Sequence, residues 1–355
     1  MEQAASDIQE SKIFKREDMK IIVPMAGMGK RMRPHTLVTP KPLLPIAGKP
    51  IVQRLVEDIV GVCKEKVDEV AYVIGDFGKE IESKLIKIAE DLGAKGSIYY
   101  QQEPLGTAHA IYCAKDSLKG KVVVAFADTL FRAEFNFDDS CDGIVWVKKV
   151  DDPRAFGVIK LNDKNQITAF VEKPDMFVSD LAIIGIYYFK DGENLSSEIK
   201  YILDNKILDK GEYQLTVALE NMMKKGKVIL PGKVNEWMDC GNKDATVDTN
   251  KRILELSKNN GKMIAANLIK ENSVIIDPCF IGENVEIRNS VIGPHVSISE
   301  NTKIDNSVIS NSIIQSNSTL SNLILHNSML GNNVNIEGVS KELSLGDYST
   351  QSSTN

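Results

Sequence analysis

A repeat of 17 residues near the end of the chain restricts the possible folds more than any other feature of the sequence. After about residue 262 the helical periodicity stops, and asparagine, serine and single aliphatic residues take over. An Asn-Ser pair recurs at 272–273, 289–290 and 306–307. Aliphatic residues 17 positions apart form four columns, which are Val274, Val291 and Val308; Ile275, Ile292 and Ile309; Ile281 and Ile298; and Ile287 and Ile304.

Within one period the aliphatic residues recur every five to six positions. This spacing is typical of a hexapeptide-repeat solenoid, in which each coil has three short sides. We expect an aliphatic residue from each side to point into the coil. The alternatives are a β-sandwich or a low-complexity linker, but neither would keep four columns in register. Later coils continue, with some slippage, through Ile314, Leu320, Leu325, Leu330 and Ile336.

Before the repeat, strand-like and helix-like segments alternate from residue 19 to about residue 250. The early strands are apolar throughout, as expected when helices cover both faces of a parallel sheet. We therefore predict an α/β fold with an open, mixed but mainly parallel sheet flanked by helices, whose ligands bind at the carboxyl ends of strands. The predicted strands are 20–24, 69–74, 97–101, 121–126, 143–149, 156–161, 167–171, 182–189 and 227–230. The predicted helices are 51–64, 78–92, 106–116, 195–204, 214–224 and 243–257.

The length of 355 residues accommodates two domains. We predict a disordered tail over 1–18, the α/β domain over 19–260, the solenoid domain over 261–340 and a polar tail over 341–355. The net charge is −6 without a large basic block, so we expect no nucleic-acid partner. No apolar run approaches the ~20 residues of a membrane span, and we expect no membrane association. The five cysteines never form a CxxC spacing, which fits a reducing cytoplasm.

A loop with two glycines follows the first predicted strand directly. Gly27 and Gly29 let the backbone approach an anion and expose N–H groups to it. The loop is neither a P-loop nor a dinucleotide-binding fingerprint, because Lys30 is followed by arginine and the third glycine position holds a methionine. Arg31 and Lys41 are separated by a proline-stiffened segment, and both could turn back over bound phosphates. Taken singly, each could equally be an ordinary solvated cation.

The segment 25–45 resembles the signature of the sugar-1-phosphate nucleotidylyltransferase family, roughly Ala-Gly-Gly-x-Gly-Thr-Arg-Leu-x-Pro-x-Thr-x-x-x-Pro-Lys-Pro-Leu-Leu-Pro. Met28 stands in place of the second glycine and Lys30 in place of the usual threonine. With its solenoid, the chain is similar to glucose-1-phosphate thymidylyltransferase-like members that end in a left-handed β-helix. The resemblance implies that this segment binds a nucleoside triphosphate and steadies its charge through Ala26, Gly27, Gly29, Arg31 and Lys41.

The segment 101–110 resembles the nucleobase-binding segment of the same family. The resemblance implies that Gln101, Gly106 and Thr107 bind the nucleotide, with Gly106 letting the backbone approach the base. A glutamine amide offers one donor and one acceptor, which suits the N3–H and adjacent carbonyl of thymine or uracil. Guanosine-specific relatives tend to have glutamate at this position, so we predict dTTP or UTP. We interpret His109 as a helix residue and not as a catalyst.

Two aspartates match the family's metal ligands. Asp128 follows the apolar strand 122–127, and Asp239 lies in a segment that resembles the Trp-x-Asp-x-Gly motif. The resemblance implies that both bind Mg²⁺, which prefers oxygen ligands combined with substrate phosphates. From the residues alone, Asp128 could equally be a helix N-cap.

Three segments resemble the sugar side of the family's site. The resemblance implies a backbone contact from Gly157, a contact of Glu172 with sugar hydroxyls and a contact of Lys173 with the sugar phosphate. Asp180 replaces the family's usual asparagine, and Gly185 would lie in the lining of the sugar pocket. Glu212, in the segment 211–216, would support the site.

The expected reaction joins a nucleoside triphosphate to a sugar 1-phosphate, for which we predict glucose 1-phosphate, and releases pyrophosphate. Alternatives in the same class are guanylyl transfer to mannose 1-phosphate and uridylyl transfer to a hexosamine 1-phosphate. A binding protein without turnover is a further alternative. So is a bifunctional enzyme whose solenoid transfers acyl groups with His295 or His326 as the base. We expect a homo-oligomer, since a short solenoid often mediates self-association.

Overall fold

The computed structural model describes residues 19–63, 65–135, 140–258 and 263–339. The two predicted tails and the predicted domain junction at 260–261 lie outside these residues. The chain divides into two compact units. Of the described residues, the first unit comprises those within 19–27, 55–127 and 131–237, and the second comprises those within 28–54, 128–130 and 238–339. The predicted domain boundaries stay a prediction.

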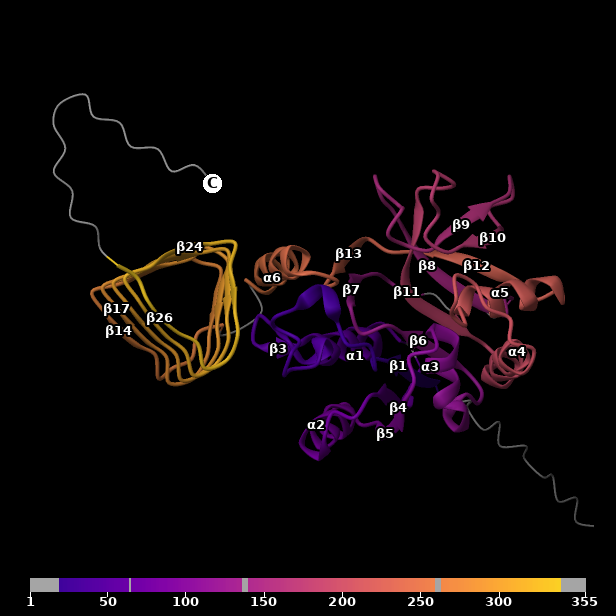
Figure 1. Ribbon diagram of the computed structural model, residues 1–355, viewed down its shortest axis with the longest axis horizontal. Helices are drawn as coiled ribbons and strands as arrows, with labels where there is room; N and C mark the ends of the chain where they lie inside the picture. The colour runs from indigo at the N-terminus through magenta and orange to yellow at the C-terminus, as the bar shows by residue number, and fades with distance from the viewer. Residues whose placement is uncertain (1–18, 64, 136–139, 259–262, 340–355) are drawn as a thin grey trace, which may run out of the picture. The chain divides into compact units, whose positions relative to one another are not determined.

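The first unit is built around a nine-stranded mixed sheet (Figure 1). Its strand order is β10-β9-β11-β6-β1-β4-β5, and β8 pairs with both β11 and β12. Strands β6, β1, β4 and β5 are mutually parallel, whereas β11 runs antiparallel to β6, β8 and β9. The strands are β1 (Met19–Pro24), β4 (Val67–Ile74), β5 (Lys95–Tyr100), β6 (Val122–Ala125), β8 (Gly143–Lys149), β9 (Val158–Leu161), β10 (Ile167–Val171), β11 (Leu181–Phe189) and β12 (Ile229–Lys233). This confirms the predicted fold class.

Helices flank this sheet and bury its apolar side chains. They are α2 (Lys79–Asp91), α3 (Thr107–Cys113), α4 (Gly192–Asp204) and α5 (Leu215–Lys224), while α1 (Ile51–Val62) begins in the second unit and continues into the first. Ile111, Ile199 and Leu219 from three of these helices share one apolar core with Val124 and Val145 of the strands. The predicted helices are confirmed with small shifts at their ends. Helix α3 is shorter than expected and is followed by a 3-10 turn, η3 (Lys115–Ser117).

The second unit contains the short elements that carry the glycine loop. They are the 3-10 turns η1 (Lys30–Met32) and η2 (Lys41–Leu43) and the two-residue strands β2 (Pro45–Ile46) and β3 (Lys49–Pro50). Helix α6 (Lys243–Ser257) agrees with its prediction. Strands β7 (Thr129–Arg132) and β13 (Glu236–Asp239), each of which has residues in both units, form a two-stranded sheet. None of the four short strands is predicted from the sequence, because they are too short to show a periodicity.

The repeat forms three parallel sheets, which appear end-on as a triangular coil in Figure 1. They are β14-β17-β20-β23-β26, β15-β18-β21-β24 and β16-β19-β22-β25. This is consistent with the predicted left-handed β-helix. Their bounds are β14 (Ile269–Glu271), β15 (Val274–Ile275), β16 (Cys279–Ile281), β17 (Glu286–Arg288), β18 (Val291–Ile292), β19 (Val296–Ile298), β20 (Lys303–Asp305), β21 (Val308–Ser310), β22 (Ser312–Ile314), β23 (Thr319–Ser321), β24 (Ile324–His326), β25 (Met329–Leu330) and β26 (Asn335–Glu337).

The residues of each predicted column pair with one another in neighbouring coils of the structure. Ile292 pairs with Ile309, and Ile298 pairs with Ile314, in the buried interior of the coil. The spacing shortens from 17 to 16 residues because the turn from Ile309 to Ser312 is one residue shorter than the turn from Ile292 to Val296. This accounts for the slippage in the later coils.

One of the four columns lies on the outside of the coil. Val274 and Val308 point out of the coil, with 55% and 47% of their surface exposed, and Ile324 in the next coil is 85% exposed. Neighbouring residues of a strand face opposite sides, so the next column along the chain, which contains Ile292, fills the interior instead.

Asparagines at the corners explain the composition of the repeat. Asn272, Asn289, Asn306 and Asn322 all have φ between 44° and 57°, in the left-handed region that asparagine tolerates better than most residues. Their side chains also connect the coils: the Nδ2 of Asn272 donates to the Oδ1 of Asn289 at 2.9 Å, and Asn306 donates to Asn322 at 2.6 Å. Within the described residues, no helix is both long and apolar enough to cross a membrane.

Candidate active site

The glycine loop lies where its backbone can approach another molecule. Gly29 has a φ of 57°, and a Cβ atom there would lie 3.0 Å from the Cβ of Lys41 and 3.2 Å from the Cγ2 of Thr36. The hydroxyl of Thr36 donates to the carbonyl oxygen of Gly29 at 2.8 Å, which closes the loop. Gly27 has no atom within 4 Å of its ideal Cβ position, so its backbone is open. Whether Ala26, Gly27 and Gly29 bind phosphate stays a prediction.

In the second unit, the structure brings together Lys41 and Asp128, which are 87 residues apart in sequence. The Nζ of Lys41 lies 2.8 Å from the Oδ2 of Asp128, and the Lys41 side chain is only 13% exposed. Such a charge-assisted hydrogen bond orients both groups. The backbone of Asp128 is held as well, because its carbonyl oxygen accepts from the N–H of Cys240 at 2.9 Å.

Asp239, at the end of β13, is influenced electrostatically by these groups. Burial raises the pKa of its carboxyl, and the negative charge of Asp128 raises it further. The N–H of Gly241, which donates to Oδ1 of Asp239 at 3.0 Å, opposes this increase together with the cations Lys41 and Arg31. A divalent cation would relieve the repulsion between the two carboxylates, so they fit a Mg²⁺ site. Since the described residues contain no group of three or more His, Cys, Asp or Glu that could hold a metal, substrate oxygens would have to complete it.

Gly241 has a second function in this cluster. A Cβ atom there would lie 3.0 Å from one carboxylate oxygen of Asp239 and 3.3 Å from the Nη2 of Arg31. Glycine thus lets the aspartate and arginine side chains lie close to the backbone here, where a Cβ atom would displace them slightly. The structure therefore groups four of the predicted residues in the second unit: Arg31, Lys41, Asp128 and Asp239.

Helix α6 supports this cluster through buried polar side chains that the sequence does not single out. The hydroxyl of Thr249 donates to the carbonyl oxygen of Asp239 at 2.7 Å. The Oδ1 of Asn250 accepts from the N–H of Ala47 at 2.9 Å and from the hydroxyl of Ser297 in β19 at 2.7 Å. The helix thus connects the loop after Lys41, the backbone of Asp239 and the solenoid.

The predicted base-binding segment lies in the first unit, at the end of β5 and the start of α3. Gly106 has a φ of 119°, and a Cβ atom there would lie 2.5 Å from the carbonyl oxygen of Tyr213. The hydroxyl of Thr107 accepts from the N–H of Leu215 and donates to the side chain of Gln214. Both residues therefore have structural roles here, and their predicted contacts with a nucleotide stay predictions.

The side-chain Nε2 of Gln101 lies 3.3 Å from the carbonyl oxygen of Gly106 and 3.0 Å from the Nδ1 of His109. Burial lowers the pKa of His109, while the charge of Glu103 raises it. The sequence interpretation missed this contact of His109. The sequence did contain an indication of this contact. His109 follows Gly106 by three residues at the start of a helix, so both residues lie in the same helical turn.

On the predicted sugar side, Gly157 and Glu172 lie together. A Cβ atom on Gly157 would lie 2.9 Å from the Oε2 of Glu172, so glycine leaves room for this carboxylate. The charge of Glu172 contributes, after burial, to raising the pKa of Tyr187 in β11. Lys173 has a φ of 40°, and its Nζ lies 3.5 Å from the Oε1 of Glu172.

The last two predicted sugar residues have partners within the chain. Asp180 forms an ion pair with Lys149 at 2.9 Å. Gly185 has a φ of 84° and lies where the register between β11 and β8 shifts, and its carbonyl oxygen accepts from the N–H of Phe126. The structure shows a backbone reason for glycine at 185 and an engaged carboxylate at 180, while their contacts with a sugar stay predictions.

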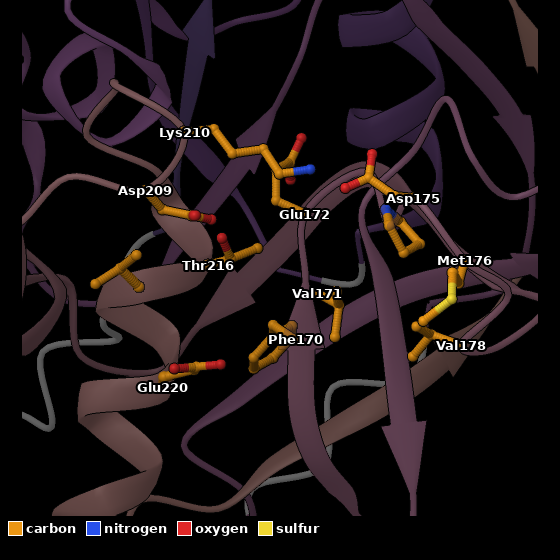
Figure 2. A pocket seen from close by; sticks show the side chains of 12 residues that line it. Phe170, Val171, Glu172, Asp175, Met176, Val178, Asp209, Lys210, Thr216 and Glu220 are labelled. Atoms are coloured by element: carbon orange, nitrogen blue, oxygen red, sulfur yellow. The ribbon is translucent and has the colours of Figure 1, made fainter.

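A cavity of about 540 Å³ lies beside Glu172, between the end of β10, the segment 172–178 and the start of α5 (Figure 2). Figure 2 shows Phe170 and Met176 as apolar parts of its lining, with Asp209 and Lys210 on another side. The Nζ of Lys210 donates to the carbonyl oxygen of Lys173 at 2.6 Å. Lys210 therefore holds the backbone next to Glu172, a contact that the sequence did not indicate.

Known proteins with similar sequences fit this arrangement. The nucleotidyl transferase family matches residues 20–255. The "Bifunctional protein GlmU" of Methanococcus maripaludis is 33% identical over 270 residues, which cover 73% of this chain and 62% of the relative. The "Low-salt glycan biosynthesis nucleotidyltransferase Agl11" of Haloferax volcanii is 28% identical, covering 90% of this chain and 94% of the relative. The glucose-1-phosphate thymidylyltransferase of Streptomyces griseus is 26% identical, covering 93% and 98%.

Solved structures show the same fold. A nucleoside-diphosphate-sugar pyrophosphorylase from Vibrio cholerae superposes with a TM-score of 0.56 at 20% identity, covering 65% of this chain and 99% of that one. A UDP-glucose pyrophosphorylase complexed with UDP-glucose superposes with a TM-score of 0.54 at 24% identity, covering 67% and 99%. The chain belongs to the nucleotidyl transferase family, as its glycine loop and its paired aspartates indicated. The Streptomyces griseus relative is by its name a sugar-1-phosphate nucleotidyltransferase, and together with the family match this confirms the predicted enzyme class.

Proposed function

We propose that the chain transfers a nucleotidyl group from dTTP or UTP to glucose 1-phosphate and releases pyrophosphate. The observation that carries the proposal is the cluster of two cations and two carboxylates in the second unit, with Lys41 bonded to Asp128 at 2.8 Å and Arg31 beside Asp239. The transfer of a nucleotidyl group requires positive charges on the triphosphate and carboxylates that can hold a metal ion, because catalysis of this step consists mainly of positioning and charge stabilisation.

In the proposed reaction, an oxygen of the sugar phosphate forms a bond to the α-phosphorus of the triphosphate. The bond from this phosphorus to the β-phosphate oxygen breaks, and pyrophosphate leaves with its electron pair. The attacking phosphate is already anionic near neutral pH, so no general base is required. Arg31 and Lys41 would hold the triphosphate, and Lys173, which is largely exposed, would hold the attacking phosphate.

Asp128 and Asp239 would hold Mg²⁺, which supplies charge neutralisation at the phosphate oxygens when it is bound. Gly157, Glu172, Asp180 and Gly185 would contact the sugar, and Gln101 would read the base. The cavity beside Glu172 supports a sugar-binding role for this region, because carboxylates and apolar side chains share its lining.

Pyrophosphate release, measured over a panel of nucleoside triphosphates and sugar 1-phosphates, tests the proposal. We expect release with dTTP or UTP together with glucose 1-phosphate, and only when Mg²⁺ is supplied. Turnover only with GTP and mannose 1-phosphate, or only with UTP and a hexosamine 1-phosphate, would assign the alternative specificity. Tight nucleotide binding without release in any combination would identify a binding protein instead.

Acyl transfer by the solenoid receives less support. The Nε2 of His295 lies 2.5 Å from the Oε1 of Glu255 in α6, and the Nδ1 of His326 lies 2.9 Å from the hydroxyl of Ser310. Both rings thus have partners inside the second unit. The outward column of Val308 and Ile324 supports instead the proposal that the solenoid mediates a homo-oligomer. The five cysteines, all of which lie within the described residues, form no disulfide bond with one another, which supports a cytoplasmic location.

A further inference from the structure

The side-chain amide of Gln101 is already engaged on one side. Its Nε2 lies 3.3 Å from the carbonyl oxygen of Gly106 and 3.0 Å from the Nδ1 of His109. A carbonyl oxygen can only accept, so the Gly106 contact identifies the nitrogen end of the amide. An amide nitrogen carries two hydrogens, and these two partners use both of them.

The second hydrogen bond requires a particular state of the histidine. The Nδ1 of His109 accepts a hydrogen bond only when the ring is neutral and its proton is on Nε2. Burial of the ring favours the neutral form, and Glu103 is the charged residue that opposes it. The neutral ring and the amide therefore support each other.

We propose that His109 is a positioning residue for base recognition. It holds the amide of Gln101 so that the nitrogen faces Gly106 and the carbonyl oxygen, Oε1, is presented to the base. This inference rests on the proposed function, in which Gln101 reads the base. In this orientation Gln101 accepts a hydrogen bond and does not donate one.

The orientation changes which bases Gln101 can select. An acceptor suits a base whose ring nitrogen on the Watson–Crick edge carries a hydrogen, namely uracil, thymine and guanine. Adenine and cytosine present a bare ring nitrogen there, which would oppose the lone pairs of Oε1. Gln101 therefore disfavours adenine and cytosine, while the choice among uracil, thymine and guanine depends on other residues. This refines the sequence interpretation, in which the amide offers both a donor and an acceptor to the base.

Two substitutions at position 109 separate positioning from packing. In His109→Phe the ring shape is kept and the acceptor is lost, so only the carbonyl oxygen of Gly106 still favours this orientation and the amide turns over more readily. In His109→Asn the side-chain Oδ1 can take the place of Nδ1 and restore the acceptor. A purely structural role of His109 predicts the opposite order, because phenylalanine fills the space better than asparagine does.

The readout is kcat/KM for UTP, dTTP, GTP, ATP and CTP, measured by pyrophosphate release with the full chain. We expect His109→Phe to reduce the discrimination of UTP over ATP and CTP by about tenfold, as for one hydrogen bond. The change should lie in KM for the triphosphate and leave kcat at saturation nearly unchanged. His109→Asn should recover most of the discrimination.

Discrimination equal to that of the parent in His109→Phe overturns the inference, and so does a loss in His109→Asn as large as in His109→Phe. If the parent chain shows no turnover with any pair of substrates, the proposed function fails separately. Calorimetric binding of UTP and ATP to the same three proteins then tests the positioning role by the same order of effects.

Discussion

Asn250 is the residue at which the contribution of α6 can be measured most directly. Its side chain is fully buried, and its Oδ1 accepts from both Ala47 and Ser297. Its Nδ2 is buried and has no hydrogen-bond partner among the described residues. Asn250→Leu would leave two buried donors unpaired, at about 1–3 kcal/mol each, and would remove one unpaired donor of similar cost. We therefore expect a net destabilisation of about 1–3 kcal/mol.

Urea unfolding followed by far-UV circular dichroism measures this loss. Ser297→Ala is the matched variant, because it removes one of the two donors and leaves the bond from Ala47 intact. In the double variant the Ser297 hydroxyl is no longer orphaned. The double variant should therefore lose less stability than the sum of the single variants, by about 1 kcal/mol. Additive losses, or an Asn250→Leu protein as stable as its parent, would refute the reasoning.

Three further predictions concern the charged cluster and the solenoid. Asp128→Asn or Lys41→Met should lower kcat by about 100-fold or more while the circular dichroism spectrum stays unchanged; near-normal turnover would remove that residue from the site. A hydrogen bond from His295 lowers the pKa of the Glu255 carboxyl. The contact therefore stabilises the folded protein at pH values above the ordinary carboxyl pKa, and this stabilisation is lost as the pH falls through the lowered pKa. His295→Ala should flatten the pH dependence of the urea midpoint in that acidic range, and an unchanged dependence contradicts this. Ile324→Lys places a charge in the outward column and should reduce the particle mass measured by light scattering. An unchanged mass would show that this column does not mediate association.

The sequence predicts the solenoid well because its signal is a period, and a period also defines the register between coils. It does not predict which of two neighbouring columns faces inward. Val274 and Ile275 are both aliphatic, and only the packing of the coil assigns them to opposite faces. The strands β2, β3, β7 and β13 are missed for a different reason, since two to four residues show no recognisable alternation.

The candidate site follows from the sequence only in part. Residue types and spacing indicate an anion-binding loop at Gly27 and Gly29, but they do not bring Lys41 to Asp128. Only the resemblance to a family placed Lys41 and Asp128 in the same site, because a contact between residues 87 positions apart depends on the fold. The contacts of Lys210 and Asn250 follow from neither spacing nor resemblance, and the contact of His109 is indicated only by its spacing from Gly106. Each is a polar side chain whose partner is set by tertiary packing.

The contacts of α6 also affect how the solenoid should be tested. Truncation near residue 262 would remove Ser297, and with it a hydrogen bond to Asn250, which binds the backbone at Ala47 a few residues after Lys41. Such a truncated protein could lose activity through the charged cluster even if it kept its oligomeric state. Ile324→Lys changes only an exposed side chain in the outward column. A loss of activity on truncation together with full activity of a dissociated Ile324→Lys protein would show that the solenoid supports the site directly and not through association.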